Sequence, residues 1–493
     1  MEPLSATDYA LVDLKDELSL LAHAKKLEGH TFREVLELGV APAGVSREYN
    51  SRRYKGGMGT LIEERYFGYR ANSDARADFP DAGVELKTTC LDVKRDGSPV
   101  AGERLVLTMI PFDRPIEDEL ACSHLWAKVG RILLIYYRRD KSVDAYDQVI
   151  EHVALFTPPP ADMAVIEQDY REICELVRCG RAQELSEGKT RYLGACTKGA
   201  TAASSWSKQY YPPHALAKRR AFCFKQPYMS YVLTRYIIGD EVEADCIVKD
   251  PAALAHTGFE DYVLSLVSPY VGMSDREICD TLGVAYTGGK AQWSTISYRM
   301  LGLSGNRAAE FEKANISVRT VRIEESGHVR ESLSLDTFSF EGLLACKDWE
   351  QSALFRYFEE TRFFFVSFRK SGDSYLLAGA RFWSMPTGDI DGPLRACWEQ
   401  ARKTVSEGVR LTKSTNSKGR IVICNNLPKS TENTVAHVRP HTSRAAYLLS
   451  DGTSVGNVEC DGDRLPDGQW MTKQSFWLNS DYIRKIVNFK EGE

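Results

Sequence analysis

Three residues with the types and spacing of a metal-dependent hydrolytic centre lie in "DFPDAGVELKTTCLDV", residues 78–93. Asp78 precedes a strand-like apolar run, and Glu85 and Lys87 lie within that run. Side chains at i and i+2 of a strand share a face, so Glu85 and Lys87 are expected to point the same way. Carboxylates bind hard cations such as Mg²⁺, and a lysine beside the cation can orient or deprotonate an attacking water. The stretch is therefore a candidate centre for phosphodiester hydrolysis.

An ordinary charged hairpin is the competing interpretation of the same residues. The pattern D-x6-E-x-K occurs by chance in many charged strands, and spacing alone favours the hairpin over catalysis. For catalysis, Asp78 should end one strand and Glu85 should lie in the next, so that a hairpin brings both carboxylates to one cation. The rest of the chain has to decide between the two interpretations.

The composition is that of a globular protein with more than one domain. The chain has 493 residues, of which 43% are hydrophobic and 27% charged, and usual domain sizes make two domains the first expectation. No basic segment followed by an apolar one opens the chain, and no apolar stretch approaches a membrane span, so we expect a cytoplasmic protein. The 12 cysteines form no CxxC pair, which favours reduced thiols over disulfides or structural zinc.

Positive charge is unevenly distributed, although the net charge is -5. No acidic residue lies between Glu187 and Asp240, where nine lysines and arginines occur. A second basic stretch, residues 408–450, contains a single acid, Glu432. A solvated charged face normally mixes both signs, so two long stretches of one sign favour a polyanionic partner such as nucleic acid.

The chain also shows signs of an internal duplication. The tripeptide Ser-Glu-Gly precedes both basic stretches, at 186–188 and 406–408, and residues 78–93 align without a gap on 310–325. Each half is predicted to open with helices, to continue with three or four strands, and to end with a helix and a basic loop region. This order indicates an α/β domain built twice.

The duplication predicts a division of labour between the halves. The aligned residues of the second copy differ from those of the first: Glu310 stands for Asp78, Ser317 for Glu85 and Arg319 for Lys87. The second copy therefore cannot assemble the same cation site. We expect a catalytic domain at 1–240, an acidic linker at 241–256, and a second domain at 257–493 that binds but does not cut.

The residues around this centre resemble a known family. "KGGMGTLIEERYFG" (55–68) followed by "DFPDAGVELKTT" is similar to the active-site region of the MutH endonucleases, a branch of the PD-(D/E)xK nuclease fold. The segments "ELSEGKTRYLGACTKGA", "DPAALAH", "HVRPHT" and "WMTKQSFWLNSDYI" resemble restriction endonucleases of the Sau3AI type, which fuse two MutH-like halves and cut GATC. The resemblance covers nearly the whole chain and implies two tandem MutH-like domains, the second without the catalytic motif.

The resemblance implies four catalytic residues: Glu63, Asp78, Glu85 and Lys87. Asp78, Glu85 and the backbone carbonyl of Leu86 would hold Mg²⁺, and Lys87 would serve the water. Glu63 would be the helix acid that completes the acidic cluster. Glu64 takes that place if the helix register differs by one.

Ten basic residues are expected to contact DNA: Lys55, Lys128, Lys198, Lys218, Arg219, Arg220, Lys225, Arg439, His441 and Lys473. Lys198, in "ACTKGA", and Arg439 and His441, in "VRPHTS", lie where the family has a base-reading loop. Arginine, or lysine more loosely, bonds guanine O6 and N7 in the major groove. The first half has Cys196-Thr197 where the family loop has Arg-Pro, so which donor reads guanine there stays open. Lys218 to Arg220 would grip phosphates.

Other interpretations apply to the histidines and aromatic residues nearby. His437 and His441 are four residues apart, but Pro440 would interrupt a helix there and no carboxylate accompanies them, which disfavours a zinc site. The halves also share a Lys-Gln dipeptide, Lys225-Gln226 and Lys473-Gln474, on which "FKQPYMSYVL" and "TKQSFWLNSDYI" can be aligned. The aromatic residues nearby are more often core than DNA-stacking residues: Tyr228, Phe476 and Trp477.

Residues and resemblance together predict a Mg²⁺-dependent type II restriction endonuclease. The resemblance implies cleavage of double-stranded DNA at GATC, 5′ of the guanine, with 5′-phosphate ends and a second GATC site bound by the C-terminal domain. One catalytic centre per chain requires a transient dimer on DNA or sequential nicking, and a cognate methyltransferase would be a genetic partner. The alternatives are a mismatch-repair nicking endonuclease and a DNA-binding regulator that does not cut.

Overall fold

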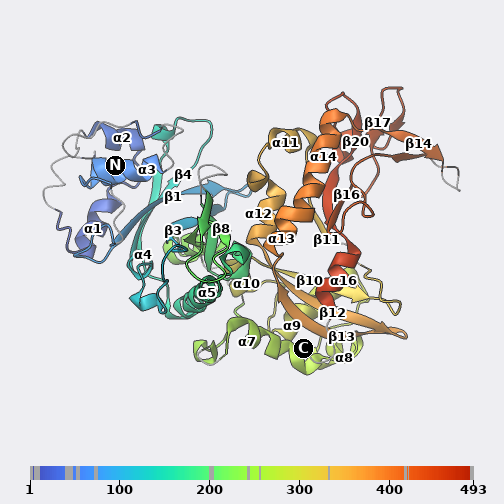
Figure 1. The fold of residues 1–493 in the computed structure, drawn as a ribbon, viewed down its shortest axis with the longest axis horizontal. Helices are drawn as coiled ribbons and strands as arrows, with labels where there is room; N and C mark the ends of the chain where they lie inside the picture. The colour runs from blue at the N-terminus through green and yellow to red at the C-terminus, as the bar shows by residue number, and fades with distance from the viewer. Residues whose placement is uncertain are drawn as a thin grey trace. The chain divides into compact units, whose positions relative to one another are not determined.

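The computed structural model describes residues 4, 12–38, 48–50, 56–71, 76–198, 205–240, 245–254, 257–330, 333–415, 419 and 421–488. The protein is a mixed α/β molecule whose internal contacts divide it into two compact units (Figure 1). Unit 1 comprises Met1–Gly258 and Ala308–Asn315, and unit 2 comprises Phe259–Arg307 and Ile316–Glu493. Within the described ranges, no helix has the length and apolarity to cross a membrane.

The main sheet of unit 1 has the strand order β2-β1-β4-β5. Strand β1 (Glu85–Val93) runs parallel to β4 (Ile132–Arg138), with Glu85 opposite Ile132. Strands β2 (Pro99–Ala101) and β5 (Ile150–Phe156) pair antiparallel on the two sides. β4 reads "ILLIYYR" and its first five residues are fully buried, as expected for a parallel strand covered on both faces. This buried strand fixes the position of β1.

Short helices at the N-terminal end of unit 1 share a hydrophobic core with this sheet. They are α1 (Glu17–Lys25), α2 (Phe32–Glu37), α3 (Gly57–Leu61) and the π-helical turn η2 (Ile62–Tyr66). Leu61 and Ile62 pack in the same core as Leu86 of β1 and Ile135 of β4. The sheet therefore anchors the helical segment that carries Glu63.

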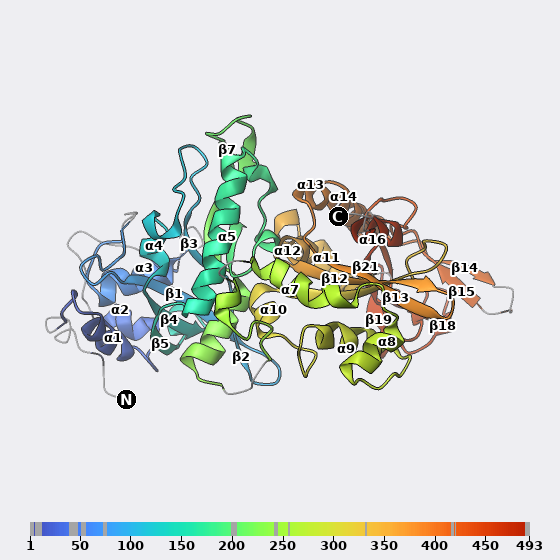
Figure 2. The same ribbon diagram turned by 90° about the horizontal axis from the view of Figure 1, so that it is seen from below.

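A second sheet of unit 1, with order β3-β9-β6, is antiparallel throughout. Its strands are β3 (Leu105–Met109), β9 (Arg220–Phe224) and β6 (Leu193–Thr197). The long helix α5 (Pro160–Arg178) contacts β6 and is prominent in Figure 2. The other elements are α4 (Trp126–Val129), the hairpin strands β7 (Trp206–Lys208) and β8 (Leu216–Lys218), α6 (Gln226–Tyr231) and η8 (Val232–Ile237).

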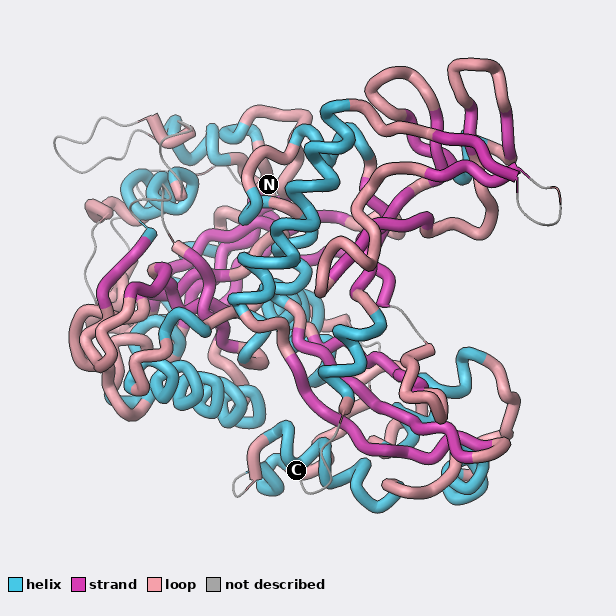
Figure 3. The backbone as a smooth tube through the Cα atoms, turned by 45° about the vertical axis from the view of Figure 1, so that its right-hand side comes forward, coloured by secondary structure: helices cyan, strands magenta, loops and turns pink. Residues whose placement is uncertain are grey.

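Two of the sheets in unit 2 correspond in kind to those of unit 1. In the first, β10 (Ile316–Ile323) runs parallel to β12 (Arg362–Ser371), and β13 (Ser374–Trp383) pairs antiparallel with β12. Figure 3 shows β12 and β13 as long strands lying side by side. The second sheet, β11-β21-β16, is antiparallel and consists of β11 (Leu333–Phe338), β21 (Gln474–Leu478) and β16 (Ala436–Pro440).

Helices α7 (Phe259–Val267), α8 (Asp275–Leu282) and α9 (Lys290–Met300) contact the first sheet of unit 2. Helix α14 (Arg395–Glu407) contacts β16. The remaining helices and strands of unit 2 are α11 (Phe340–Ala345), α12 (Ala353–Glu360), α13 (Thr387–Asp389), η12 (Ile390–Leu394), β14 (Thr412–Thr415), β15 (Ile421–Cys424), β17 (Tyr447–Leu448), β18 (Ser454–Val455), α15 (Val458–Asp461), β19 (Gly462–Arg464), β20 (Trp470–Thr472) and α16 (Ser480–Val487).

The structure contradicts an alignment of the two halves on the dipeptides Lys225-Gln226 and Lys473-Gln474. Lys225-Gln226 follows β9, whereas Lys473-Gln474 lies at the start of β21. Both strands occupy the middle of a three-stranded antiparallel sheet, and by position Lys225 corresponds to Asn479, the residue between β21 and α16. A shared dipeptide is too short to define an alignment when both segments also contain apolar strands.

Helix α10 (Ala309–Ala314) belongs to unit 1, although the residues on both sides of it belong to unit 2. Residues 78–84, which align with this segment, form a turn closed by a Phe79–Val84 bridge and not a helix. The helix ends at Asn315, whose φ of 56° is a left-handed conformation that asparagine tolerates. Glu310 accepts hydrogen bonds from the N–H groups of Ile247 and Val248, each at 3.0 Å. Glu310 therefore holds the loop at Ile247 and Val248 in place, and it lies in a helix and not in a turn like that of Asp78.

A buried ion pair fixes α10 within unit 1. Lys313 Nζ lies 2.7 Å from Asp162 Oδ1 and 3.1 Å from the hydroxyl of Tyr236. It also lies 4.3 Å from the centre of the Tyr231 ring. The hydroxyl of Tyr228 donates to the other carboxylate oxygen of Asp162 at 3.2 Å. Charges taken out of water in this way are tolerated only when they are paired.

Replacing Lys313 by methionine should destabilise the protein. Among the described residues, Lys313 is the only oppositely charged partner of the buried Asp162 carboxylate, and the variant removes it. Loss of one member of a buried pair typically costs about 3 kcal/mol or somewhat more. Urea unfolding followed by circular dichroism measures the change. The double variant Lys313→Met/Asp162→Asn is the control and should regain part of the loss; equal stability of Lys313→Met and the unmodified chain would contradict the prediction.

Candidate active site

A tight turn presents Asp78 to the edge of β1. A single β-bridge between Phe79 and Val84 closes the turn, with backbone hydrogen bonds of 2.9 and 3.1 Å. Asp78 therefore lies beside an isolated bridge, and not at the end of a regular strand as the catalytic interpretation expected. Asp78 Oδ2 accepts the N–H of Leu86 at 3.0 Å. This hydrogen bond holds the carboxylate next to the first residues of β1.

The backbone carbonyl of Leu86 points to the same edge as Asp78. The N–H of Glu85 donates to Arg131 on the β4 side at 3.0 Å, whereas the N–H of Leu86 donates to Asp78. In a strand the N–H and C=O of one residue point to the same side, and successive residues alternate. β2 pairs with β1 only further along, at Leu91–Val93. The Leu86 carbonyl is thus available beside the Asp78 carboxylate.

Glu85 is held between two ammonium groups. Its side chain is almost fully buried, with 1% exposed. Lys87 Nζ lies 2.5 Å from Oε1 and Lys128 Nζ lies 2.8 Å from Oε2. The expectation that Glu85 and Lys87 point the same way is confirmed by this contact.

Lys128 was predicted to approach the DNA backbone, but the structure places it inside the acidic cluster. Its side chain is 9% exposed, and besides Glu85 it donates to the carbonyl of Arg76 at 2.6 Å. The reason is topological, because α4 directly precedes β4 and β4 is the parallel neighbour of β1. Only the strand order brings Lys128 to Glu85, and spacing along the chain carries no signal for it.

Glu63 lies in η2, directly after a glycine-rich helix start. Gly56 has φ of +89°, and a Cβ on Gly57 would lie 1.7 Å from the carbonyl oxygen of Tyr49, so only glycine fits at position 57. Glu64 turns the other way, since the hydroxyl of Tyr49 donates to its Oε2 at 2.8 Å. The structure therefore brings Glu63, and not Glu64, toward the cluster.

Burial and nearby carboxylates raise the pKa values of two acids of the cluster, Glu63 and Asp78. Burial raises the pKa of Glu63 to about 7, and the charges of Asp78 and Glu85 contribute to the rise while Lys87 opposes it. Burial likewise raises the pKa of Asp78 to about 6, again with a contribution from Glu85. Such a site carries more negative charge than the two lysines balance. An all-oxygen donor set with this excess charge fits a hard divalent cation.

The basic stretch of unit 1 does not form one exposed face. Lys198 and Arg219 are exposed and Lys218 is half-buried. Arg220 is buried and donates to the carbonyl of Ala195 at 2.7 Å. Lys225 is also buried; it donates to the carbonyls of Thr190 and, at 3.4 Å, of Ala314. These positions favour DNA contact by Lys198, Lys218 and Arg219 and do not favour it for Arg220 or Lys225. Lys55 lies outside the described residues.

The loop predicted to read bases in unit 2 presents an exposed arginine. The Arg439 guanidinium stacks on the ring of Trp477, 4.0 Å from its centre. His441 Nδ1 lies 3.0 Å from the carbonyl oxygen of Leu335, and Lys473 Nζ donates to the carbonyl of Cys460 at 2.7 Å. His441 also meets the Trp477 ring edge to face, with ring centres 5.1 Å apart, so Arg439 and His441 are two exposed residues oriented by the same aromatic surface.

Strand pairing equates the two predicted base-reading loops. β6 pairs with β9 with Thr197 opposite Arg220, and β16 pairs with β21 with Pro440 opposite Gln474. In both sheets the first residue of the middle strand pairs with the last residue of the neighbouring strand. By this register Lys198 corresponds to His441, and Cys196 corresponds to Arg439. The first unit thus has no arginine at this position of the loop.

The other histidine and aromatic residues have structural partners. His437 Nδ1 lies 2.7 Å from Asn479 Oδ1, whereas His441 Nδ1 lies beside the carbonyl of Leu335. The two histidines therefore bond different residues. Tyr228 and Phe476 are buried, as expected for core residues, whereas Trp477 is only partly buried.

A second group of potential ligands lies in the β3-β9-β6 sheet. One ligand atom from each of Glu187, Cys196 and Cys223 lies within 4.8 Å of the others. The carboxylate of Glu187 already forms an ion pair with Arg104, which balances its charge without a cation. All 12 cysteines of the chain are free thiols.

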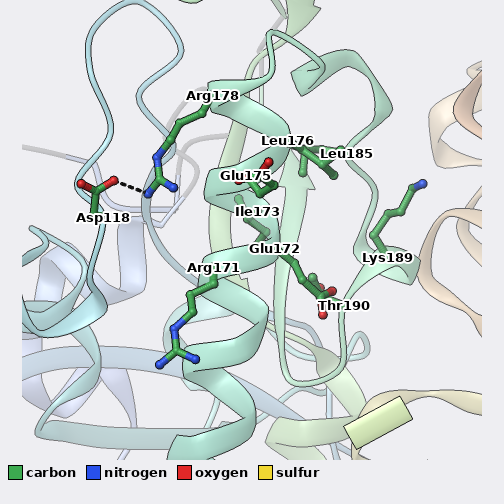
Figure 4. Close-up of a pocket in the computed structure, with 10 residues that line it drawn as sticks. All are labelled: Asp118, Arg171, Glu172, Ile173, Glu175, Leu176, Arg178, Leu185, Lys189 and Thr190. Carbon is green, nitrogen blue, oxygen red and sulfur yellow. Dashed lines mark ion pairs between the residues drawn. The ribbon is translucent and has the colours of Figure 1, made fainter. Parts of the chain in front are cut away.

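Cavities in both units lie away from the carboxylate cluster. A cavity of about 620 Å³ lies along α5, and Figure 4 shows Arg178 of its wall with the guanidinium turned toward Asp118, 2.7 Å away. A cavity of about 920 Å³ lies along α14 and includes Arg410. Both adjoin the residues around a Ser-Glu-Gly tripeptide, and neither is lined by a predicted catalytic residue.

Comparisons with known proteins identify relatives of both kinds named by the sequence resemblance. A family profile described as the DNA mismatch repair enzyme MutH matches residues 67–169. The chain is 35% identical over 450 residues to the type II restriction enzyme Sau3AI of Staphylococcus aureus, which covers 86% of this chain and 91% of that protein. The MutH proteins of Shigella boydii serotype 18 (strain CDC 3083-94 / BS512) and Escherichia coli (strain SMS-3-5 / SECEC) are each 27% identical over 223 residues, covering 45% of this chain and 93% of theirs.

The raised pKa values predict a pH-dependent stability in the cation-free protein. Asp78 and Glu63 have folded-state pKa values of about 6 and about 7, above those of unfolded carboxyl groups, so the folded state binds more protons between about pH 4 and pH 7. Their contribution to the free energy of unfolding should therefore fall as the pH rises through this window. Urea unfolding at a series of pH values in EDTA measures the fall.

The double variant Glu63→Gln/Asp78→Asn is the control for this measurement, because its side chains do not titrate. It should show a smaller fall in the free energy of unfolding between pH 4 and pH 7 than the unmodified chain. Indistinguishable pH profiles of the two proteins would contradict the assignment of the raised pKa values.

Proposed function

This chain belongs to the MutH-related family of the type II restriction enzyme Sau3AI, and from this premise we propose that it is a Mg²⁺-dependent endonuclease that cleaves both strands of DNA at GATC. The observation that carries the proposal is the buried cluster at the edge of β1, where Glu85 is held by Lys87 and Lys128 next to Asp78 and Glu63. The resemblance of the loop residues supports GATC, cleavage 5′ of the guanine and 5′-phosphate ends.

The proposed reaction assigns a task to each group of the cluster. Asp78, Glu85 and the Leu86 carbonyl would hold the cation, which when bound supplies positive charge to the phosphate and lowers the pKa of water. Lys87 lies on the same strand face as Glu85 and orients the attacking water. Lys128 is the second cation at Glu85 and holds that carboxylate in place.

The proposal includes two tandem MutH-like domains with different tasks. Residues 1–240 would form the catalytic domain, 241–256 the linker and 257–493 a domain without the catalytic motif. Three strands of the first sheet follow the same order in both units, β1-β4-β5 and β10-β12-β13, which supports a common origin. The register supports it too, with Glu85 opposite Ile132 and Ser317 opposite Phe363.

Unit 2 lacks the chemistry of the cluster at these aligned positions. Ser317 has no carboxylate, and Arg319 donates to the hydroxyl of Tyr357 at 3.1 Å. Glu310 uses both carboxylate oxygens for backbone N–H groups. These contacts support a unit that binds DNA and does not cut it.

The second unit would bind a further GATC duplex and stimulate cleavage by the first. Support comes from Arg439, which is exposed and stacked on Trp477; stacking restricts the side chain before DNA arrives and leaves its donors free for guanine. Double-stranded DNA is thus the proposed partner at two sites of the chain. Cleavage of both strands with one centre per chain implies a transient dimer on DNA or two successive nicks.

Cleavage tests the catalytic assignment. Glu85→Ala and the closer analogue Glu85→Gln should each lower the rate of plasmid cleavage with Mg²⁺ by at least about 100-fold, because both remove the carboxylate common to the cation site and the two lysines. Sequencing of the product ends identifies the site and the cut position. Circular dichroism establishes that Glu85→Gln is folded.

The matched control for this experiment is Ser317→Ala, at the aligned position of unit 2, which should cleave at the normal rate. Persistent cutting by folded Glu85→Gln would remove Glu85 from the site. Nicking of one strand only would favour the mismatch-repair activity, and binding without any cutting would favour a regulator.

A duplex added in trans tests the second site. A short GATC duplex should raise the rate of cleavage of a one-site plasmid, and Arg439→Ala should abolish this rise because it removes the proposed guanine donor. Arg484→Ala, which changes an exposed arginine of α16, is the control and should keep the stimulation. Equal rates with and without the added duplex would speak against an effector site.

A further inference from the structure

Tyr69 has a buried hydroxyl group that the proposed reaction does not yet use. Among the residues that the structure describes, the hydroxyl has no hydrogen-bond partner, and its oxygen is shielded from solvent. A buried hydroxyl without a partner costs free energy, and such groups in folded proteins usually await a water, an ion or a substrate. The position of the ring shows which of these it could meet.

Two contacts fix Tyr69 to the two acidic segments of the active site. Its backbone N–H donates to the carbonyl of Glu63 at 3.2 Å. Its ring meets the ring of Phe79 edge to face, with centres 5.6 Å apart and an angle of 81°. Phe79 directly follows Asp78 in the turn that presents the carboxylate. Tyr69 is thus anchored to the η2 segment through its backbone and to the Asp78 turn through its ring.

The hydroxyl lies in the negative field of the cluster and stays protonated there. Burial raises its pKa strongly, and the charges of Asp78, Glu63 and Glu85 raise it further. A neutral phenol is a hydrogen-bond donor, and all three neighbours that act on it are acceptors. Tyr69 therefore holds one donor within the field of these carboxylates, and the donor bonds none of the described residues.

We propose that Tyr69 is a positioning residue of the active site, whose hydroxyl donates a hydrogen bond to a water in the hydration shell of the bound divalent cation. The inference rests on the proposed metal-dependent function. Mg²⁺ usually keeps several of its waters when carboxylates bind it, and groups that bond to the outer side of the coordination shell strongly influence metal affinity. A neutral donor suits this place because it binds a water without competing for the carboxylates.

Tyr66 provides a matched comparison in the same segment. Its hydroxyl is also buried, but it donates to the backbone carbonyl of His23 at 2.8 Å. Removing this satisfied hydroxyl leaves a buried carbonyl without its donor. The two tyrosines therefore predict opposite results when each is changed to phenylalanine.

Titration of the DNA-free chain with Mn²⁺, followed by the electron paramagnetic resonance signal of free Mn²⁺, measures cation affinity. Thermal unfolding in EDTA measures stability. Tyr69→Phe should weaken Mn²⁺ binding about 10-fold with an unchanged or higher unfolding midpoint, because it keeps the contact with Phe79. Tyr66→Phe should lower the midpoint and leave Mn²⁺ affinity unchanged. The Mg²⁺ concentration for half-maximal cleavage should rise in Tyr69→Phe alone.

Three results would overturn the inference. The first is unchanged Mn²⁺ affinity in Tyr69→Phe while the unmodified chain binds Mn²⁺ and cleaves DNA. The second is a lower unfolding midpoint of Tyr69→Phe, which would make the hydroxyl structural. The third is normal Mn²⁺ affinity with weaker binding of a GATC duplex in Ca²⁺, which would assign the hydroxyl to the DNA phosphate. Absence of Mn²⁺ binding and cleavage in the unmodified chain would instead refute the proposed function itself.

Discussion

The buried carboxylate of Glu85 between two ammonium groups is the interaction on which the site depends. A carboxylate removed from water stays ionised only when cations and hydrogen bonds compensate for the lost hydration. Lys87 reaches it from the same strand, and Lys128 reaches it because α4 leads into the parallel neighbour β4. A shift of one residue between β1 and β4 would turn Glu85 to the other face of the sheet. The fully buried residues of β4 therefore serve the chemistry by fixing this register.

The two units differ in the segment that directly precedes the equivalent strands β1 and β10. In unit 1 the tight turn at 78–84 lets Asp78 accept one hydrogen bond from the described backbone, that of Leu86, so the carboxylate keeps acceptor capacity for a cation. In unit 2 the corresponding segment is α10. There both carboxylate oxygens of Glu310 accept backbone N–H groups, and Lys313 pairs with Asp162. The segment before β1 therefore positions a carboxylate for a cation, whereas the segment before β10 makes structural contacts within unit 1.

Local spacing was sufficient to predict some parts of the site, and long-range packing was required for others. The shared face of Glu85 and Lys87 follows from the period of a strand, and the pairing of Lys198 with His441 follows from the alignment of two short loops. The burial of Arg220 and Lys225, the place of Lys128 and the helix at 309–314 depend on how strands and segments far apart in the chain meet. Charge counted along the sequence could not distinguish a lysine that bonds a buried carbonyl from one that faces solvent.

The active site holds its groups in an arrangement that is unfavourable for the cation-free fold. Three carboxyl groups converge on two ammonium groups, the pKa values of Glu63 and Asp78 are raised, and the hydroxyl of Tyr69 has no partner among the described residues. Each of these features costs free energy of folding unless a cation and its waters are bound. Apolar packing of the surrounding core compensates for this loss of stability, because η2 and β1 share one hydrophobic cluster with β4. Rigid packing around the cluster thus keeps the acids together, and the same closeness creates the affinity for a divalent cation.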